Sequence, residues 1–331
     1  MATSSGANPD RTAPSHGFTD PMAHCRARVC SSRRVAAASA IIRRRARPRS
    51  ATAGLCSAED AVHEPVRTPS SPPDLSGRVV LVTGATGGLG APIARACAAA
   101  GATVVLHARV VRKLESLADA IDAAGHPSPI LLPLDFASAT AQDFSSVESA
   151  LSRETGRLDA VIHMAAALGS LGPEEHQALD AWLDVLRVNV AAPMALTRAV
   201  VPLLRTSPAG CGRVILTLDT RSDAPRAYWG AYGASKAALA AFASTLADEW
   251  EHRTDLAVGA VVPGPIRSPL RMRTHPGEDR TTLPPPESIV PLYLHLLRDD
   301  VPGGVRLDAA AWLADQPASS SLLPAAAGGR A

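Results

Sequence analysis

Residues 78–90 read RVVLVTGATGGLG, a short apolar run that ends in a glycine-rich turn. An apolar run of this length that stops at glycines is typical of a buried parallel strand. Glycines permit a tight turn from strand to helix and let the backbone approach a pyrophosphate, and a helix that begins near Gly90 would point its free amides at that anion. The stretch therefore predicts a nucleotide-binding turn, whose candidate residues are Thr83, Gly84, Thr86, Gly88, Leu89 and Gly90.

From Gly77 onward, apolar runs alternate with helical patterns. The runs that we predict as strands are 78–83, 102–107, 130–134, 158–163, 213–218 and 256–262. The helical patterns are 89–101, 111–123, 174–190, 193–205, 231–252 and 288–298. This alternation predicts an α/β fold, with a Rossmann-type doubly wound parallel sheet of about seven strands flanked by helices. We expect one NAD(P)-binding domain over residues 76–315.

Residues 1–75 differ in composition from the rest of the chain. They are rich in Ala, Ser, Pro and Arg, contain a basic run at 43–49, and show neither a helical nor an alternating period. Such a segment buries too little apolar surface to offset the entropy of ordering. A disordered arm, an organelle transit peptide and an over-extended gene start all agree with this composition, and we favour a disordered arm without a catalytic role. Residues 316–331 are expected to form a loose tail.

The overall composition excludes several classes of function. The net charge of +2 over 331 residues gives no bias toward nucleic acid, and no apolar run approaches the length of a membrane span. The cysteines form no CxxC pair and have no histidine at zinc-like spacing, which predicts free thiols and no metal site. They are Cys25, Cys30, Cys56, Cys97 and Cys211. We expect a cytoplasmic protein whose partner is a small molecule, with no nucleic acid and no membrane.

The glycine spacing TGxxxGxG and several later motifs resemble the short-chain dehydrogenase/reductase family, classical type, and within it the bacterial oxidoreductases. The resemblance runs from about residue 77 to about residue 300. An aspartate follows the third strand, an asparagine lies in the long fourth helix, a YxxxK pair opens the next long helix, and Pro-Gly follows the sixth strand. In this chain these landmarks are Asp135, Asn189, Tyr232 with Lys236, and Pro263 with Gly264.

The resemblance implies a set of cofactor contacts beyond the glycine turn. Asp135 and Phe136 would lie near the adenine, and Lys236 would contact the nicotinamide ribose. Ala165, Pro263, Gly264 and Ser268 complete the residues that the resemblance places beside the cofactor. The family also implies a homodimer or a homotetramer, with the fourth helix and helix 231–252 at the interface.

The end of the second strand indicates the type of cofactor. NAD-preferring sites usually place a carboxylate there for the ribose 2′-hydroxyl. This chain has Ala108 in that place, followed by Arg109, whose guanidinium can pair with a 2′-phosphate. We therefore predict NADP(H) as the preferred cofactor and NAD(H) as a possible one, and we favour the phosphate role of Arg109 over the alternative that it covers a helix end.

The YxxxK pair predicts the proton transfer that accompanies hydride transfer to a carbonyl. A tyrosine has an ordinary pKa of about 10, and a lysine at i+4 lies on the same helical face, where its charge favours the tyrosinate. By resemblance, Tyr232 is the proton donor or acceptor, Lys236 tunes it, and Asn189 helps to hold a water in the proton relay. The sequence thus predicts an NADP(H)-dependent oxidoreductase that interconverts a carbonyl and an alcohol on a small organic substrate.

Three positions depart from the family pattern. Asp219 stands where the family has a serine that orients the carbonyl. After the fourth strand, where the family has Asn-Ala-Gly, Met164 replaces the asparagine and Ala166 replaces the glycine. An ionised Asp219 would oppose tyrosinate and repel an oxyanion, whereas a protonated one could donate to the carbonyl. A local shift could instead bring Thr220 or Ser222 into the role of the serine. The alternative function is therefore a nucleotide-binding protein of this fold with impaired or lost catalysis and a binding or regulatory role.

The family resemblance implies that the segment after Pro263-Gly264 covers the substrate. It carries Arg271, Arg273 and His275, which could favour an anionic substrate. A solvated loop surface explains the same charges, and we favour that explanation.

Overall fold

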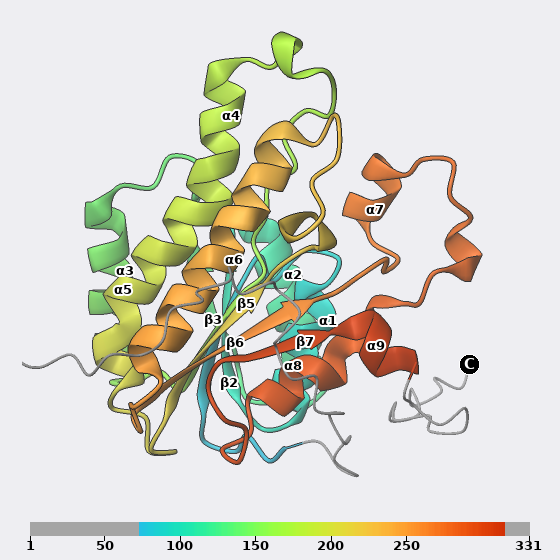
Figure 1. Cartoon of the computed structure of the whole chain (residues 1–331). Helices are drawn as coiled ribbons and strands as arrows, with labels where there is room; N and C mark the ends of the chain where they lie inside the picture. Colours follow the sequence, from blue (N-terminus) through green and yellow to red (C-terminus); the bar gives the residue numbers. More distant parts are fainter. Residues whose placement is uncertain (1–72, 315–331) are drawn as a thin grey trace, which may run out of the picture. The chain divides into compact units, whose positions relative to one another are not determined.

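The structure is a computed structural model that describes residues 73–314, and the arm and tail expected from the sequence lie almost wholly outside them (Figure 1). The strands in this part of the chain form one parallel sheet in the order β3-β2-β1-β4-β5-β6-β7. Their bounds are β1 Val79–Thr83, β2 Thr103–Ala108, β3 Ile130–Pro133, β4 Ala160–His163, β5 Gly212–Thr217, β6 Leu256–Val262 and β7 Val305–Asp308. The expected doubly wound, Rossmann-type sheet of about seven strands is confirmed.

Helices cover both faces of the sheet (Figure 1). The α-helices are α1 Gly90–Ala99, α2 Val111–Ala123, α3 Ala141–Glu154, α4 Leu179–Leu186, α5 Ala192–Leu204, α6 Gly230–Trp250, α7 Pro269–Thr274, α8 Val290–Leu296 and α9 Ala309–Ala314. Side chains of α1, α2 and α8 pack on one face, and those of α3, α5 and α6 pack on the other. None of the helices in residues 73–314 is long and apolar enough to cross a bilayer.

Each face of the sheet has its own hydrophobic core. The apolar side of α2 is buried, with Leu114, Leu117 and Ile121 on the first face. Every residue of β1 and of β6 is buried, as expected for strands that have neighbours on both sides and helices on both faces.

The order of the strands positions the site. Strand β1 lies between β2 and β4, so the chain winds outward from β1 in both directions. In open α/β sheets, ligands bind at the carboxyl ends of the strands where the winding reverses. The segments that follow β1, β4 and β5 meet at this edge, and they carry most of the motifs found in the sequence.

The structure differs from the expected elements in several places. Helices α3, α7 and α9 were not identified from the sequence, and neither was the edge strand β7. The helical stretch expected from residue 174 begins as the short 3-10 helix Glu174–His176, and α4 starts only at Leu179. Leu75, placed at the end of the arm, is fully buried, and its amide donates to Ala100 O at 2.8 Å. The folded part therefore begins before residue 76.

Candidate active site

The glycine-rich turn is closed by contacts that exclude side chains. Gly84 has φ +64°, and a Cβ atom there would lie 2.8 Å from the Ala165 nitrogen and Cα. Its amide donates to Nδ1 of His107 at 3.3 Å, while a Cβ on Gly90 would collide with the Gly84 carbonyl oxygen. No hydrogen-bond acceptor within residues 73–314 pairs with the amides of Gly88, Leu89 or Gly90. Unpaired amides at the start of α1 are what an anionic ligand requires.

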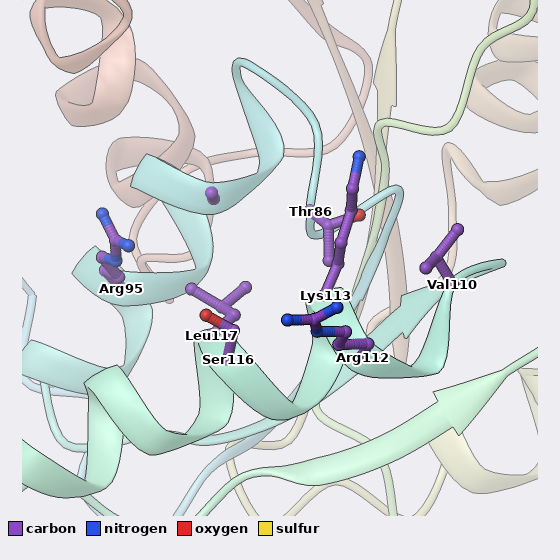
Figure 2. A pocket seen from close by; sticks show the side chains of 8 residues that line it. Thr86, Arg95, Val110, Arg112, Lys113, Ser116 and Leu117 are labelled. Atoms are coloured by element: carbon purple, nitrogen blue, oxygen red, sulfur yellow. The ribbon is translucent and has the colours of Figure 1, made fainter.

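A basic pocket of about 560 Å³ opens beside this turn. Figure 2 shows Thr86 of the turn lining it together with Arg112 and Lys113 of α2 and Arg95 of α1. Arg109, the residue expected to bind a 2′-phosphate, is exposed next to the pocket and does not line it. Arg112 and Lys113 were not predicted from the sequence, although two basic residues in the first turn of a helix after strand two are a signal for anion binding.

Tyr232 and Lys236 lie one turn apart on α6 and are both buried. The Lys236 ammonium donates to the Thr217 carbonyl oxygen at 2.8 Å and lies 5.8 Å from the centre of the Tyr232 ring. Burial lowers the pKa of Lys236 to about 8, and the charge of Asp219 acts in the opposite direction. An ammonium with one protein acceptor keeps hydrogens for a further ligand such as a sugar hydroxyl.

Asp219 lies at the N-cap of the 3-10 helix Thr220–Ser222 and contacts the tyrosine directly. Tyr232 Oη donates to Asp219 Oδ2 at 3.0 Å. The other oxygen, Oδ1, accepts from the Arg221 amide at 2.9 Å and from the Thr220 hydroxyl at 3.3 Å. Burial raises the pKa of Tyr232 well above its usual range, and both the charge of Asp219 and the hydrogen bond to it raise it further. The tyrosine is therefore held in its protonated form.

Asn189 occupies a π-helical segment, Arg187–Ala191, between α4 and α5. Its amide oxygen accepts from Ala167 N at 2.7 Å, and its Nδ2 donates to Ala167 O at 2.8 Å and to Ser235 Oγ at 2.9 Å. The side chain thus ties the segment after β4 to α6. Because both amide hydrogens are used, the side chain has no donor left for a relay water.

Met164 takes the place of the family asparagine and has partners of its own. Its sulfur accepts from Thr217 Oγ1 at 2.8 Å, and its amide donates to Thr83 Oγ1 at 3.0 Å. Thr83 also receives the Ala165 amide at 3.2 Å. The residues after β4 are thereby fixed against β1 and β5.

The remaining expected contacts lie around this edge, with differing exposure. Asp135 is exposed and accepts from the Ala137 amide at 3.1 Å, whereas the Phe136 ring is buried and stacks on His107 with centroids 4.1 Å apart. Pro263 and Gly264 follow β6, and Ser268 caps α7 by accepting from the Arg271 amide at 3.2 Å. The Phe136 side chain belongs to the core, so only its backbone is available to a ligand.

The segment after β6 does not present all its charges to a substrate. Arg271 donates two hydrogen bonds of 2.6 Å to Glu278, so its charge is paired within this segment. The rings of His275 and Trp229 lie at an angle of 46° to each other, with centroids 6.0 Å apart. Within the described part of the chain, no group of three acidic, histidine or cysteine side chains could hold a metal ion.

Comparison with known proteins places this site in a family. The family model described as short chain dehydrogenase matches residues 78–279. The chain belongs to the short-chain dehydrogenase family. It is 38% identical over 226 residues to the uncharacterized oxidoreductase YciK of Escherichia coli K12, an alignment that covers 68% of this chain and 88% of YciK.

Solved structures of other short-chain dehydrogenases share the fold. One from Shigella flexneri 2a, complexed with NADP, has a TM-score of 0.69 and 36% identity, covering 72% of this chain and all of that one. Another from Escherichia coli CFT073, complexed with NADPH, has a TM-score of 0.68 and 37% identity, covering 71% and 98%. The resemblance inferred from the sequence is confirmed, and this short-chain dehydrogenase is an oxidoreductase. The roles of its individual residues stay predictions.

Proposed function

We propose that this enzyme uses NADP(H) to interconvert a carbonyl and an alcohol on a small organic substrate, with Tyr232 as proton donor or acceptor. The observation that carries the proposal is the buried Tyr232–Lys236 pair at the carboxyl edge of the sheet, beside the glycine-rich turn. When bound, the nicotinamide supplies or accepts the hydride, and this chain supplies the proton and the binding groups.

The residues at this edge fit a phosphorylated dinucleotide. Unpaired amides at Gly88, Leu89 and Gly90 suit a pyrophosphate, and the spare hydrogens on Lys236 suit a ribose diol. Arg112 and Lys113, with Arg95, give the pocket at Thr86 the charge that a 2′-phosphate requires, and Arg109 stands exposed beside them. The complexes of two relatives with NADP and NADPH support the same cofactor here.

Reduction suits this site better than oxidation. Burial and Asp219 keep Tyr232 protonated, which is the form that can give a proton to a developing alkoxide. Lys236 favours the tyrosinate that would remain, because its ammonium lies 5.8 Å from the ring. Asn189 acts as a positioning residue that holds the segment after β4 against α6.

The test is NADPH oxidation by the purified protein against ketones, aldehydes and diketones, with NADPH and NADH binding measured in parallel. We expect NADPH to bind more tightly than NADH by at least about tenfold, and Tyr232→Phe to abolish turnover while NADPH still binds. The double variant Arg112→Ala, Lys113→Ala should bind NADPH more weakly and bind NADH with nearly unchanged affinity. Tight NADPH binding without any turnover would favour the alternative, a nucleotide-binding protein with lost catalysis.

We also propose a homodimer or a homotetramer formed through the faces of α4 to α6. Leu179 is 72% exposed, and Leu183 and Met194 are exposed as well. On α6, Ala237, Ala238 and Ala241 face solvent, so they do not pack on the sheet, and a second helix could approach them closely. Light scattering of the purified protein measures the mass of the particle in solution, and the mass of a monomer would contradict the proposal. We propose that the protein is located in the cytoplasm and that it has no nucleic-acid partner.

A further inference from the structure

Asp219 is a rigid hydrogen-bond acceptor at the place where this reaction needs a donor. Three donors converge on its carboxylate, namely the Arg221 amide, the Thr220 hydroxyl and the Tyr232 hydroxyl. A backbone amide can only donate, and Asp219 is only partly buried. Both of its carboxylate oxygens therefore serve as hydrogen-bond acceptors.

A neutral carbonyl is poorly served by this arrangement. The charge that develops on a carbonyl oxygen during hydride addition is negative, and a carboxylate beside it is repulsive. Thr220 gives its hydroxyl hydrogen to Asp219 and so cannot replace the family serine as donor. Tyr232 also points its hydrogen at Asp219 in the absence of substrate, so a carbonyl must compete with the carboxylate for it.

Asp219 itself has no cationic partner. Among the ion pairs formed within residues 73–314, none includes Asp219. Two cations lie near Asp219 without forming an ion pair with it. The Lys236 ammonium, which the charge of Asp219 stabilises, donates to the Thr217 carbonyl and lies 5.8 Å from the centre of the Tyr232 ring, and the Arg221 guanidinium lies 4.7 Å from the centre of the Trp229 ring. The carboxylate beside the reacting hydroxyl therefore has no direct ion-pair partner among the described residues.

We propose that the enzyme has a further activity, the reduction of a protonated C=N bond, and that Asp219 selects the iminium cation over a neutral carbonyl. The N–H of an iminium can donate to Asp219 Oδ2 in place of the tyrosine. Hydride from the reduced nicotinamide dinucleotide adds to the iminium carbon, and the π electrons of C=N move onto nitrogen to give a neutral amine. No proton is needed in that step, because the iminium already carries it.

This inference rests on the proposed NADP(H)-dependent hydride transfer and names a substrate class for the same site. It also accounts for why a carboxylate can stand beside Tyr232 without abolishing the chemistry. The positive charge of the substrate, not an alkoxide, is the charge that the site must stabilise.

The first test compares a methylpyrroline, a five-membered cyclic imine, with cyclopentanone as substrates for NADPH oxidation. We expect kcat/KM to be at least about tenfold higher for the imine, and Asp219→Asn to remove at least about tenfold of that preference. Asp219→Ser, which keeps a capping oxygen, should raise activity on the ketone. The control is Asp223→Asn, which removes the same charge from an exposed acid that pairs with Arg306, and which should leave the preference unchanged.

A second test needs neither cofactor nor turnover. Calorimetry on the protein alone should detect binding of pyrrolidinium but not of tetrahydrofuran, a neutral ring of the same size. Asp219→Asn should weaken the binding of pyrrolidinium by at least about tenfold. A ketone preference in the native enzyme overturns the inference, and so does pyrrolidinium binding that Asp219→Asn leaves unchanged. If NADPH binds and ketones are reduced only while Tyr232 is present, the proposed function survives that failure; if NADPH does not bind, the proposed function fails instead.

Discussion

Lys236 carries a positive charge in a place that strongly disfavours it. The side chain is 4% exposed and has one protein acceptor, the Thr217 carbonyl oxygen. Burial lowers its pKa from 10.5 to about 8. A cation whose folded pKa lies below its unfolded pKa costs stability at low pH, because the unfolded chain binds the proton more tightly. This cost disappears as pH rises from about 8 to 10.5.

Replacement of this lysine should therefore change how stability depends on pH. We expect Lys236→Met to have a larger free energy of unfolding than the native protein at pH 7.5. The difference between the two should shrink by about 3 kcal/mol by pH 10.5. Urea unfolding of both proteins at several pH values measures the difference, in which other titrating groups cancel. An advantage that stays constant over this range would show that Lys236 has an ordinary pKa.

Gly84 allows a second prediction at the scale of one residue. Its φ of +64° disfavours any side chain, and a Cβ would also press on the Ala165 backbone at 2.8 Å. Gly125 has φ +76° with nothing within 4 Å, so it isolates the conformational cost. We expect Gly125→Ala to lose about 1 kcal/mol and Gly84→Ala about 3 kcal/mol of unfolding free energy. Equal losses in denaturant titrations would rule out the close contact as the reason for glycine at 84.

The sequence predicts which residues gather at the site better than it predicts their partners. Tyr232, Lys236 and the glycines are recognisable because their spacing along one helix or one turn determines where they lie. The partners of Asn189 depend on contacts between segments far apart in the chain, because Ala167 and Ser235 lie 22 and 46 residues away from it. Arg112 and Lys113 of α2 were missed although they closely follow Arg109, the one basic residue that was identified there.

At the scale of the element, helix α8 depends on a buried cation from strand β5. The Arg213 guanidinium, on β5, donates to the carbonyl oxygens of Leu296 at 3.3 Å, Asp299 at 3.2 Å and Val301 at 2.9 Å. These oxygens end α8 and the turn after it, where a helix leaves its last carbonyls without partners. Arg213 thus fastens the C-terminal end of α8 to the sheet.

Removal of this cation should destabilise the whole domain. We expect Arg213→Met to lower the free energy of unfolding by about 3 kcal/mol, because buried carbonyls lose charged donors. Arg205→Met is the control: it removes an exposed arginine that bonds Asp255 at 3.0 Å, and it should cost about 0.5 kcal/mol. Thermal and urea unfolding measure both. A similar small loss for the two variants would mean that Arg213 merely fills space.

Helix α3 shows why some elements escape prediction. Its start has a clear local signal, a capping box in which Thr140 accepts from the Asp143 amide and Asp143 accepts from the Thr140 amide. Its buried face consists of Phe144, Val147 and Leu151, three residues in a stretch that is otherwise polar. A face this narrow is weak as a periodic pattern, so the helix is identified from its cap or not at all.

At the scale of the whole molecule, the sheet is closed at one edge by β7, a strand of only four residues. It pairs with β6, whose seven residues are all buried. The segment Val305–Asp308 alternates apolar and charged residues over too short a length to be distinguished from a loop. It becomes a strand because β6 presents unpaired backbone groups beside it. The pairing is therefore a property of the assembled sheet.

This dependence gives a prediction about where the domain ends. A chain that stops after Ala314 should unfold cooperatively with the same midpoint as the full chain, because it keeps every described element, including β7 and α9. A chain that stops after Gly303 loses β7 and α9, uncovers the edge of β6, and removes the buried Leu307, Ala309 and Trp312 from the core. We expect it to aggregate, since an exposed apolar edge strand pairs with other chains. Light scattering at rising concentration measures this, and a soluble shorter chain with an unchanged midpoint would mean that β7 contributes little to the sheet.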